Sequence, residues 1–193
     1  MPGRGEPTMQ MQCDFEQANL RKYPEQIAVA IARDANGRYN PITLGWMTQV
    51  SADPPMLAIA VGKSRYSAEV IRGARQFVVA LPSDLQQKDV MIFGTKSGRE
   101  VDKLAQAGTK TQPAVEIDSV LLEYAVANFE CRLTGEVEAG DHVIFIGEVV
   151  CSHVSSRQAW RLFVTGPGYR LGCVPPATAP DAAAPPFGRA QER

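Results

Sequence analysis

Short apolar runs separated by turn residues dominate the hydrophobic pattern of this chain. The runs IAVAIA (27–32), MLAIAV (56–61) and FVVAL (77–81) are each five or six residues long, a length that favours buried strands over helices. From Ala125 to Thr134 apolar and polar residues largely alternate, which is the period of a strand with one buried face. The pattern therefore predicts a domain built mainly from strands.

Turn residues delimit the expected strands. The Asn36-Gly37 pair is typical of a hairpin turn and separates the first run from a strand expected between Tyr39 and Val50. The segment 51–55 ends that strand, because its prolines lack the amide that a ladder needs. Later strands are expected at 142–150 and 161–165.

Three segments carry helical signals. Residues 67–75 have apolar side chains at helical spacing, and further helices are expected to start at Ser83 and at Ser97, where Gln86 and Glu100 follow three residues later. Both pairs match the capping box. No regular crossover helix separates the strands, so we expect a mainly β fold, an antiparallel barrel with peripheral helices, in place of a doubly wound parallel sheet.

Length and charge limit the function classes. The 193 residues suit one domain with a substantial core, expected over 13–174 between a loose arm (1–12) and a Pro/Ala-rich tail (175–193). A formal net charge of -1 does not favour binding to nucleic acid or to anionic membranes. No apolar run is long enough to span a bilayer, and no signal-peptide core is visible. We therefore expect a cytoplasmic protein that binds neither nucleic acid nor membrane.

The cysteines and histidines give no metal-site signal by spacing. There is no Cys-x-x-Cys pair, and the two histidines, His142 and His153, are scattered, so neither zinc nor a dithiol motif is expected. Cys131 and Cys151 lie in strand-like segments, where buried inert thiols are the simpler interpretation. His153 is expected to have a structural or surface role. No nucleophile elbow or carboxylate pair is present, so no catalytic residue is assigned.

Two basic turns next to expected helices are candidate anion sites. In the segment 97–103, a helix start with Gly98, Arg99 and Lys103 offers free amides and two cations. The segment 62–67 adds the hydroxyls of Ser64 and Ser67 and the guanidinium of Arg65, without the spacing of a P-loop. A helix cap with solvated cations, and an ordinary turn, are the simpler alternatives. Together the two segments suggest two walls of one phosphate pocket.

A third candidate is the segment 40–48. Gly45 within an expected strand indicates a bulge or a close approach by a ligand. Polar Asn40, Thr43 and Thr48 surround Trp46, and such a wall suits a planar heteroaromatic ring edged by carbonyl groups. A bulged strand with a core tryptophan is the alternative.

Taken in order, five segments resemble the flavin reductase-like, FMN-binding split-barrel family, with the flavoredoxin branch most similar. They are NPITLGWMT (40–48), VSADPP (50–55), SRYS (64–67), SGR with DK (97–103) and GDHVIFIGEV (140–149). The match runs from about Pro24 to Ser152. Each segment alone is a weak signal, but five in the same order are fairly specific.

The resemblance implies a split β-barrel homodimer that binds one FMN per subunit near the dimer interface. Residues 43–51 would then lie along the isoalloxazine ring, and the two basic turns would hold the ribityl phosphate. His142 would line the face that receives a nicotinamide, as a substrate-binding residue. The cofactor-binding residues expected from residues and resemblance together are Asn40, Thr43, Trp46, Met47, Thr48, Ser51, Ser64, Arg65, Tyr66, Ser67, Ser97, Gly98, Arg99 and Lys103.

The function that this resemblance implies is an NAD(P)H-dependent FMN reductase or the reductase component of a two-component monooxygenase. The alternative is a flavoredoxin-like electron carrier that passes electrons between protein partners through bound FMN, and the same pocket would serve both. The choice between NADH and NADPH, the tightness of FMN binding and the final electron acceptor stay open at this point.

Overall fold

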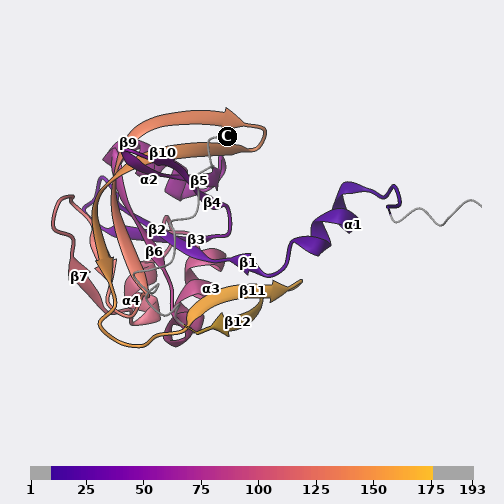
Figure 1. The fold of residues 1–193 in the computed structure, drawn as a ribbon. Coiled ribbons are helices and arrows are strands. Elements are labelled where there is room, and N and C mark those ends of the chain that lie inside the picture. The colour runs from indigo at the N-terminus through magenta and orange to yellow at the C-terminus, as the bar shows by residue number, and fades with distance from the viewer. Residues whose placement is uncertain (1–9, 176–193) are drawn as a thin grey trace, which may run out of the picture.

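The computed structural model of the protein describes residues 10–175. The expected arm (1–12) and tail (175–193) lie almost entirely outside the described residues. Strands dominate what is described (Figure 1), so the mainly β prediction is confirmed. None of the described helices is long and apolar enough to cross a membrane.

A seven-stranded antiparallel sheet forms the body of the molecule, in the order β3-β2-β6-β9-β10-β5-β4. The long hairpin β9–β10 runs across it (Figure 1) and links the half that contains β2 and β6 to the half that contains β4 and β5. Its strands are β2 (Ala28–Arg33), β3 (Tyr39–Leu44), β4 (Met47–Ala52), β5 (Pro55–Gly62), β6 (Gln76–Leu81), β9 (Ala127–Ala139) and β10 (His142–Val154).

The sheet curls because its two outer strands are consecutive in the chain. β3 pairs with β2 and β4 pairs with β5, yet only Gly45 and Trp46 separate β3 from β4. Two residues cannot cross a flat seven-stranded sheet, whose neighbouring strands lie about 4.8 Å apart, so the two edges must approach each other. The single strand expected over 39–50 is therefore wrong: the chain leaves one edge of the sheet at Leu44 and joins the other at Met47.

Two small sheets complete the strands. One contains β1 (Glu25–Gln26), β11 (Arg161–Gly166) and β12 (Arg170–Val174), and the other contains β7 (Thr111–Pro113) and β8 (Val120–Leu122). The strands expected near 27–32, 56–61, 77–81, 142–150 and 161–165 are confirmed. β7, β8 and β12 were not predicted, because three to five residues are too few for a clear hydrophobic period.

Both faces of β2 are buried, which explains its unbroken apolar run. Val29 and Ile31 pack into one hydrophobic cluster with Phe93 and Leu162. Ala28, Ala30 and Ala32 face a second cluster on the opposite side, which includes Ile59, Phe77 and Phe145. A strand covered on both faces needs apolar residues at every position.

The helices pack around this sheet. α2 (Tyr66–Ala74) begins one residue earlier than expected, and α3 (Gln87–Thr95) follows the 3-10 helix η2 (Asp84–Gln86). At η2 the predicted capping box between Ser83 and Gln86 is confirmed. Near the N-terminus, α1 (Phe15–Asn19) and η1 (Leu20–Lys22) extend away from the body (Figure 1).

The prediction of a helix that starts at Ser97 is wrong. α4 (Lys103–Ala107) begins six residues later, where the Asp102 side chain accepts a hydrogen bond of 3.0 Å from the Ala105 amide. The Ser97 hydroxyl instead accepts from the Arg99 amide within a turn. Asp is at least as good an N-cap as Ser, and Gly98 disfavours a helix. Arg99 and Lys103 therefore do not share a helix face.

Candidate functional site

The two basic turns lie side by side, although 29 residues (68–96) separate them in the sequence. They enclose a cavity of about 230 Å3 between the start of α2, the end of α3 and the start of α4. Eight predicted residues line this cavity, which we call the basic cavity: Ser64, Arg65, Tyr66, Ser67, Ser97, Gly98, Arg99 and Lys103. The structure thus brings together the two segments that sequence reasoning combined into one pocket.

Lys103 is the most constrained cation of the basic cavity. Its side chain is buried, with 3% of the residue exposed, and its Nζ donates one long hydrogen bond of 3.4 Å to the carbonyl of Phe93. Burial, with a smaller contribution from the nearby Arg65, lowers the pKa of Lys103 to about 8. No Asp or Glu is among the described residues that line this cavity. A buried ammonium without a carboxylate partner fits an anionic ligand.

Arg99 is placed differently from Lys103. Its guanidinium is exposed, forms an ion pair of 2.9 Å with Glu69 and lies 4.9 Å from the centre of the Tyr66 ring. These contacts hold Arg99 over the outer wall of the cavity. Lys103 is therefore the stronger candidate for the phosphate contact that sequence reasoning shared between the two.

Residue 98 must be a glycine, because its backbone lies directly against the side chain of Asn40. A Cβ atom at residue 98 would lie 2.0 Å from Asn40 Oδ1, so any side chain there would collide. Asn40 is buried, its Nδ2 donates to the Ser67 hydroxyl at 2.9 Å, and its Oδ1 has no hydrogen-bond partner among the described residues. Asn40 does not line the basic cavity; it supports the wall that carries Ser67.

A second cavity, of about 520 Å3, adjoins the first. Ile42, Ser64 and Arg65 line both, so the two cavities are neighbours that share one wall. We call the second one the ring cavity, because the rings of Trp46 and His142 lie at its edge with their centres 4.6 Å apart. Flat apolar walls beside a basic pocket suit a planar ring that carries a phosphate tail.

His142 is oriented by its neighbour Asp141. The Asp141 carboxylate lies 2.7 Å from His142 Nδ1, and its hydrogen bond with His142 lowers the pKa of Asp141. An ionised carboxylate accepts only, so Nδ1 carries a proton and donates it to Asp141. The other ring nitrogen, Nε2, is left for a ligand in the ring cavity.

A third cavity, of about 460 Å3, shares Thr43 and Gly45 with the ring cavity. It is lined partly by Pro167, Gly168, Tyr169 and Leu171, from a segment that the sequence could not assign to the site. The Thr43 hydroxyl, shared with the ring cavity, donates to the Val90 carbonyl at 2.7 Å. The connection between β11 and β12 therefore lies close to the ring cavity.

Four predicted residues lie outside these cavities: Asn40, described above, and three residues of β4. Met47 packs against the core, Thr48 is exposed and donates to the Gln49 carbonyl, and Ser51 lies further along β4. Conversely, sequence reasoning missed Ile42, Gly94 and Lys96, all of which line the basic cavity. Lys96 directly precedes Ser97, so a wider window around that turn would have found it, whereas Gly94 carries no local signal.

Comparisons with known proteins place most of the chain in one family. A family model described as "Flavin reductase like domain" matches residues 20–167. A flavin reductase from Pseudomonas putida is 32% identical over 152 residues, which cover 79% of this chain and 85% of that protein. An FMN-binding protein from Thermus thermophilus has a TM-score of 0.72 at 25% identity, over 92% of this chain and 100% of the other. The fold also matches flavoredoxin of Desulfovibrio vulgaris, with a TM-score of 0.76 at 21% identity over 90% and 99% of the two chains.

Proposed function

This chain belongs to the family of flavin reductase-like domains, and we propose that it is an FMN-dependent oxidoreductase that accepts electrons from NADH or NADPH. Membership makes it a flavoprotein of the oxidoreductase class; FMN as the flavin and a nicotinamide donor are the proposal. The observation that supports FMN most directly is the buried Lys103 in a basic cavity that lies next to the ring cavity.

In this proposal the basic cavity binds the phosphate. Lys103 Nζ and the hydroxyls of Ser64 and Ser67 would donate to its oxygens, and each charge-assisted contact contributes roughly 1.5–3 kcal/mol. Arg65, at the start of α2, adds a second positive charge. Bound flavin supplies the redox chemistry, and the protein supplies position and electrostatics.

His142 would position the electron donor. Asp141 orients the ring through Nδ1, and in the neutral ring Nε2 accepts a hydrogen bond from the carboxamide of a nicotinamide. Trp46, with 53% of its surface exposed, provides a flat apolar surface next to it. A nicotinamide donor also fits the cytoplasmic location expected from the sequence.

The proposal is tested by following oxidation of NADH and NADPH by the purified protein with added FMN. We expect turnover, and we expect His142→Ala to raise the Michaelis constant for the nicotinamide about 2- to 13-fold, because one hydrogen bond contributes roughly 0.5–1.5 kcal/mol. FMN content should not change, since the phosphate contacts lie elsewhere. Loss of FMN with unchanged donor kinetics would contradict the role given to His142.

An electron carrier is the second candidate function. The exposed Trp46 at the edge of the ring cavity would also suit the approach of a redox protein. Tightly bound flavin without nicotinamide oxidation would support the carrier and contradict the reductase.

We further propose that the protein acts as a homodimer. α1 buries none of its own residues, and exposed apolar side chains lie along the segment around it: Met11, Phe15 and Leu20. An apolar arm that extends from the body (Figure 1) is suited to packing on a second copy. The dimer that the family resemblance implies would give this arm a binding surface.

Sedimentation of the flavin-loaded protein at micromolar concentration tests the dimer. We expect twice the 21.0 kDa chain mass, and we expect the double substitution of Phe15 and Leu20 by Ser to shift the protein toward monomer. Val137→Ser, at an exposed apolar residue in the β9–β10 hairpin, is the matched control and should leave the mass unchanged. A wild-type monomer that retains flavin would refute the proposal.

A further inference from the structure

A bulge in β10 brings Cys151 and His153 to the same face of the sheet as Glu130. Before the bulge Val149 pairs with Cys131, and after it Cys151 pairs with Glu130, so one additional residue lies in β10. A shift of one residue moves the following side chains to the opposite face. Without the bulge, Cys151 and His153 would lie on the face of Phe129, and Glu130 would have neither neighbour.

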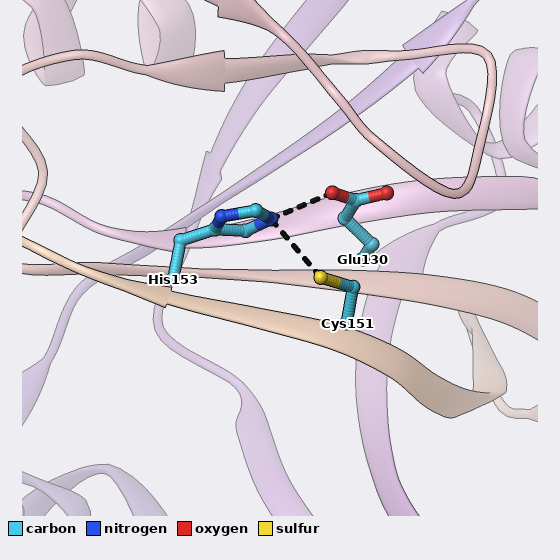
Figure 2. A group of neighbouring side chains, drawn as sticks. All are labelled: Glu130, Cys151 and His153. Carbon is cyan, nitrogen blue, oxygen red and sulfur yellow. Dashed lines mark hydrogen bonds and ion pairs between the residues drawn. The ribbon is translucent and has the colours of Figure 1, made fainter.

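The three side chains converge on one point (Figure 2). His153 Nε2 lies 2.6 Å from Glu130 Oε1 and 3.4 Å from Cys151 Sγ. The three possible ligand atoms all lie within 4.8 Å of one another. A single ring nitrogen thus faces both a carboxylate and a thiol.

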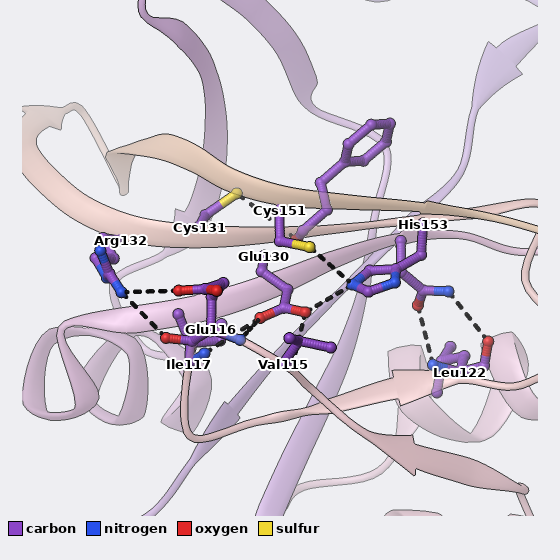
Figure 3. Close-up of polar contacts among 11 residues, drawn as sticks. Val115, Glu116, Ile117, Leu122, Glu130, Cys131, Arg132, Cys151 and His153 are labelled. Atoms are coloured by element: carbon purple, nitrogen blue, oxygen red, sulfur yellow. Dashed lines mark hydrogen bonds and ion pairs between the residues drawn. The ribbon is translucent and has the colours of Figure 1, made fainter.

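Glu130 is held rigidly from the opposite side (Figure 3). Its carboxylate accepts hydrogen bonds from the backbone amides of Val115, Glu116 and Ile117 at 2.7–3.2 Å. Among the described residues, the carboxylate oxygen Oε1 accepts from Val115 and His153 and from no other group. Each carboxylate oxygen has two lone pairs. The lone pair of Oε1 that now faces His153 could therefore bind a cation while the hydrogen bonds from the backbone amides stay in place.

We propose that Glu130, Cys151 and His153 form a zinc-binding site. Carboxylate oxygen, imidazole nitrogen and thiolate sulfur are the three ligand types that Zn2+ binds in proteins. On binding, the thiol would release its proton to solvent and the imidazole proton would move to Nδ1, which frees Nε2 for the metal. Zn2+ with one thiolate and one carboxylate is electrically neutral, which suits a site in which Glu130 is fully buried.

The distances need little adjustment. Ordinary zinc bond lengths give ligand separations of about 3.5 Å between nitrogen and sulfur and about 3.4 Å between nitrogen and oxygen in a tetrahedral site. The observed separation of 3.4 Å between Nε2 and Sγ already matches. The imidazole must move away from Glu130 by less than an ångström, and it is free to do so because 26% of its side chain is exposed near the end of β10.

Of the three proposed ligands, His153 also borders a cavity. The cavity has a volume of about 320 Å3 and is lined by His153, Asn128 and Ser155 among others. His142 and His153 lie at opposite ends of the 13-residue strand β10, so this site is separate from the ring cavity. The metal would tie β9 to β10 at the bulge and hold the loop over 115–117, with no part in electron transfer.

Cobalt(II), which takes the tetrahedral sites of zinc, is the probe for the test. The full flavin-loaded chain, with the exposed Cys13 replaced by Ser, is titrated with Co2+ and read as a difference spectrum against the same protein without metal. We expect about one equivalent to bind with a thiolate-to-cobalt charge-transfer band, and Zn2+ to displace it. Cys151→Ser should abolish the band and weaken binding about tenfold or more.

Two further variants make the test specific. Cys173→Ser removes a thiol from β12 and should leave the band unchanged. His153→Gln keeps an N–H donor for Glu130 but lacks the imidazole, so binding should fall while the protein stays folded. Absence of a thiolate band in the parent protein, or a band that survives Cys151→Ser, would overturn the proposal whatever His153→Gln does.

Discussion

Replacing Lys103 by Met should weaken FMN binding about 10- to 150-fold and leave riboflavin binding unchanged within about twofold. The factor corresponds to the roughly 1.5–3 kcal/mol of one charge-assisted phosphate contact. Riboflavin has no phosphate, so the substitution removes nothing that it uses. Titration calorimetry or quenching of flavin fluorescence gives both dissociation constants.

The same substitution should stabilise the flavin-free protein. The fall in the pKa of Lys103 from 10.5 to about 8 corresponds to roughly 3 kcal/mol at 1.36 kcal/mol per pH unit, which is an upper estimate of what burying the charge costs. Lys96→Met, at an exposed lysine in the same cavity, is the matched control. It should change FMN affinity and the stability of the flavin-free protein far less. Equal effects of the two substitutions, or equal loss of FMN and riboflavin, would exclude Lys103 as the phosphate ligand.

The pH dependence follows from the same lysine. The phosphate requires the charged ammonium, and free Lys103 loses its proton above about pH 8, so FMN affinity should fall above that pH by up to about tenfold per pH unit. In the flavin-free protein, the unfolded chain binds more protons than the folded one between about pH 8 and 10.5, so stability should rise over that range. In Lys103→Met both dependences should disappear.

Replacing Glu130 by Gln should lower the free energy of unfolding by about 2–5 kcal/mol. The fully buried carboxylate accepts from three backbone amides and from His153 (Figure 3). A Gln amide group would direct its own N–H donors at some of these donors, and each buried donor left unpaired costs about 1–3 kcal/mol. Urea unfolding in the presence of a chelator measures the loss without a metal contribution.

Glu116→Gln is the control for this prediction. Glu116 lies in the loop over 115–117 that donates to Glu130, but its own half-exposed side chain only approaches Arg132 at 3.6 Å. The loss of unfolding free energy should therefore stay below about 1 kcal/mol. Burial would raise the pKa of Glu130, but the amide and His153 hydrogen bonds outweigh it and lower the pKa below 4.5. The stability difference between the wild-type protein and the Glu130→Gln variant is therefore fully present above about pH 4.5. It should shrink as the pH falls through the lowered pKa of Glu130. Equal losses in the two variants at neutral pH would contradict this account.

Local patterns predicted the parts of the fold that depend on local chemistry. The apolar runs that became β2, β5 and β6 were found because burial on one or both faces leaves a direct mark on composition. The capping box at Ser83 was found because its partners are three residues apart. At Ser97 the same pattern failed, since Asp102 provides a competing cap.

The candidate site was predicted in part for the same reason. The turns at 62–67 and 97–103 carry cations and hydroxyls in the sequence itself, and the structure places both on one cavity. From the sequence Arg99 and Lys103 were equally good phosphate ligands, whereas burial distinguishes them: Arg99 is exposed and paired with Glu69, and Lys103 is enclosed. Burial depends on what distant segments cover a side chain, and no local pattern records it.

By itself, the sequence determined the strand-rich class, the positions of most strands and the two basic turns, because hydrophobic period, turn residues and charge are properties of neighbouring residues. Only the tertiary structure decided how the edges of the sheet meet at Gly45 and Trp46, and that a bulge in β10 places Cys151 and His153 beside Glu130. Sequence spacing carries no sign of this cluster, because side chains on two strands come together through strand register. Register is set by the pairing of whole strands, whose energy is summed over residues far apart in the chain.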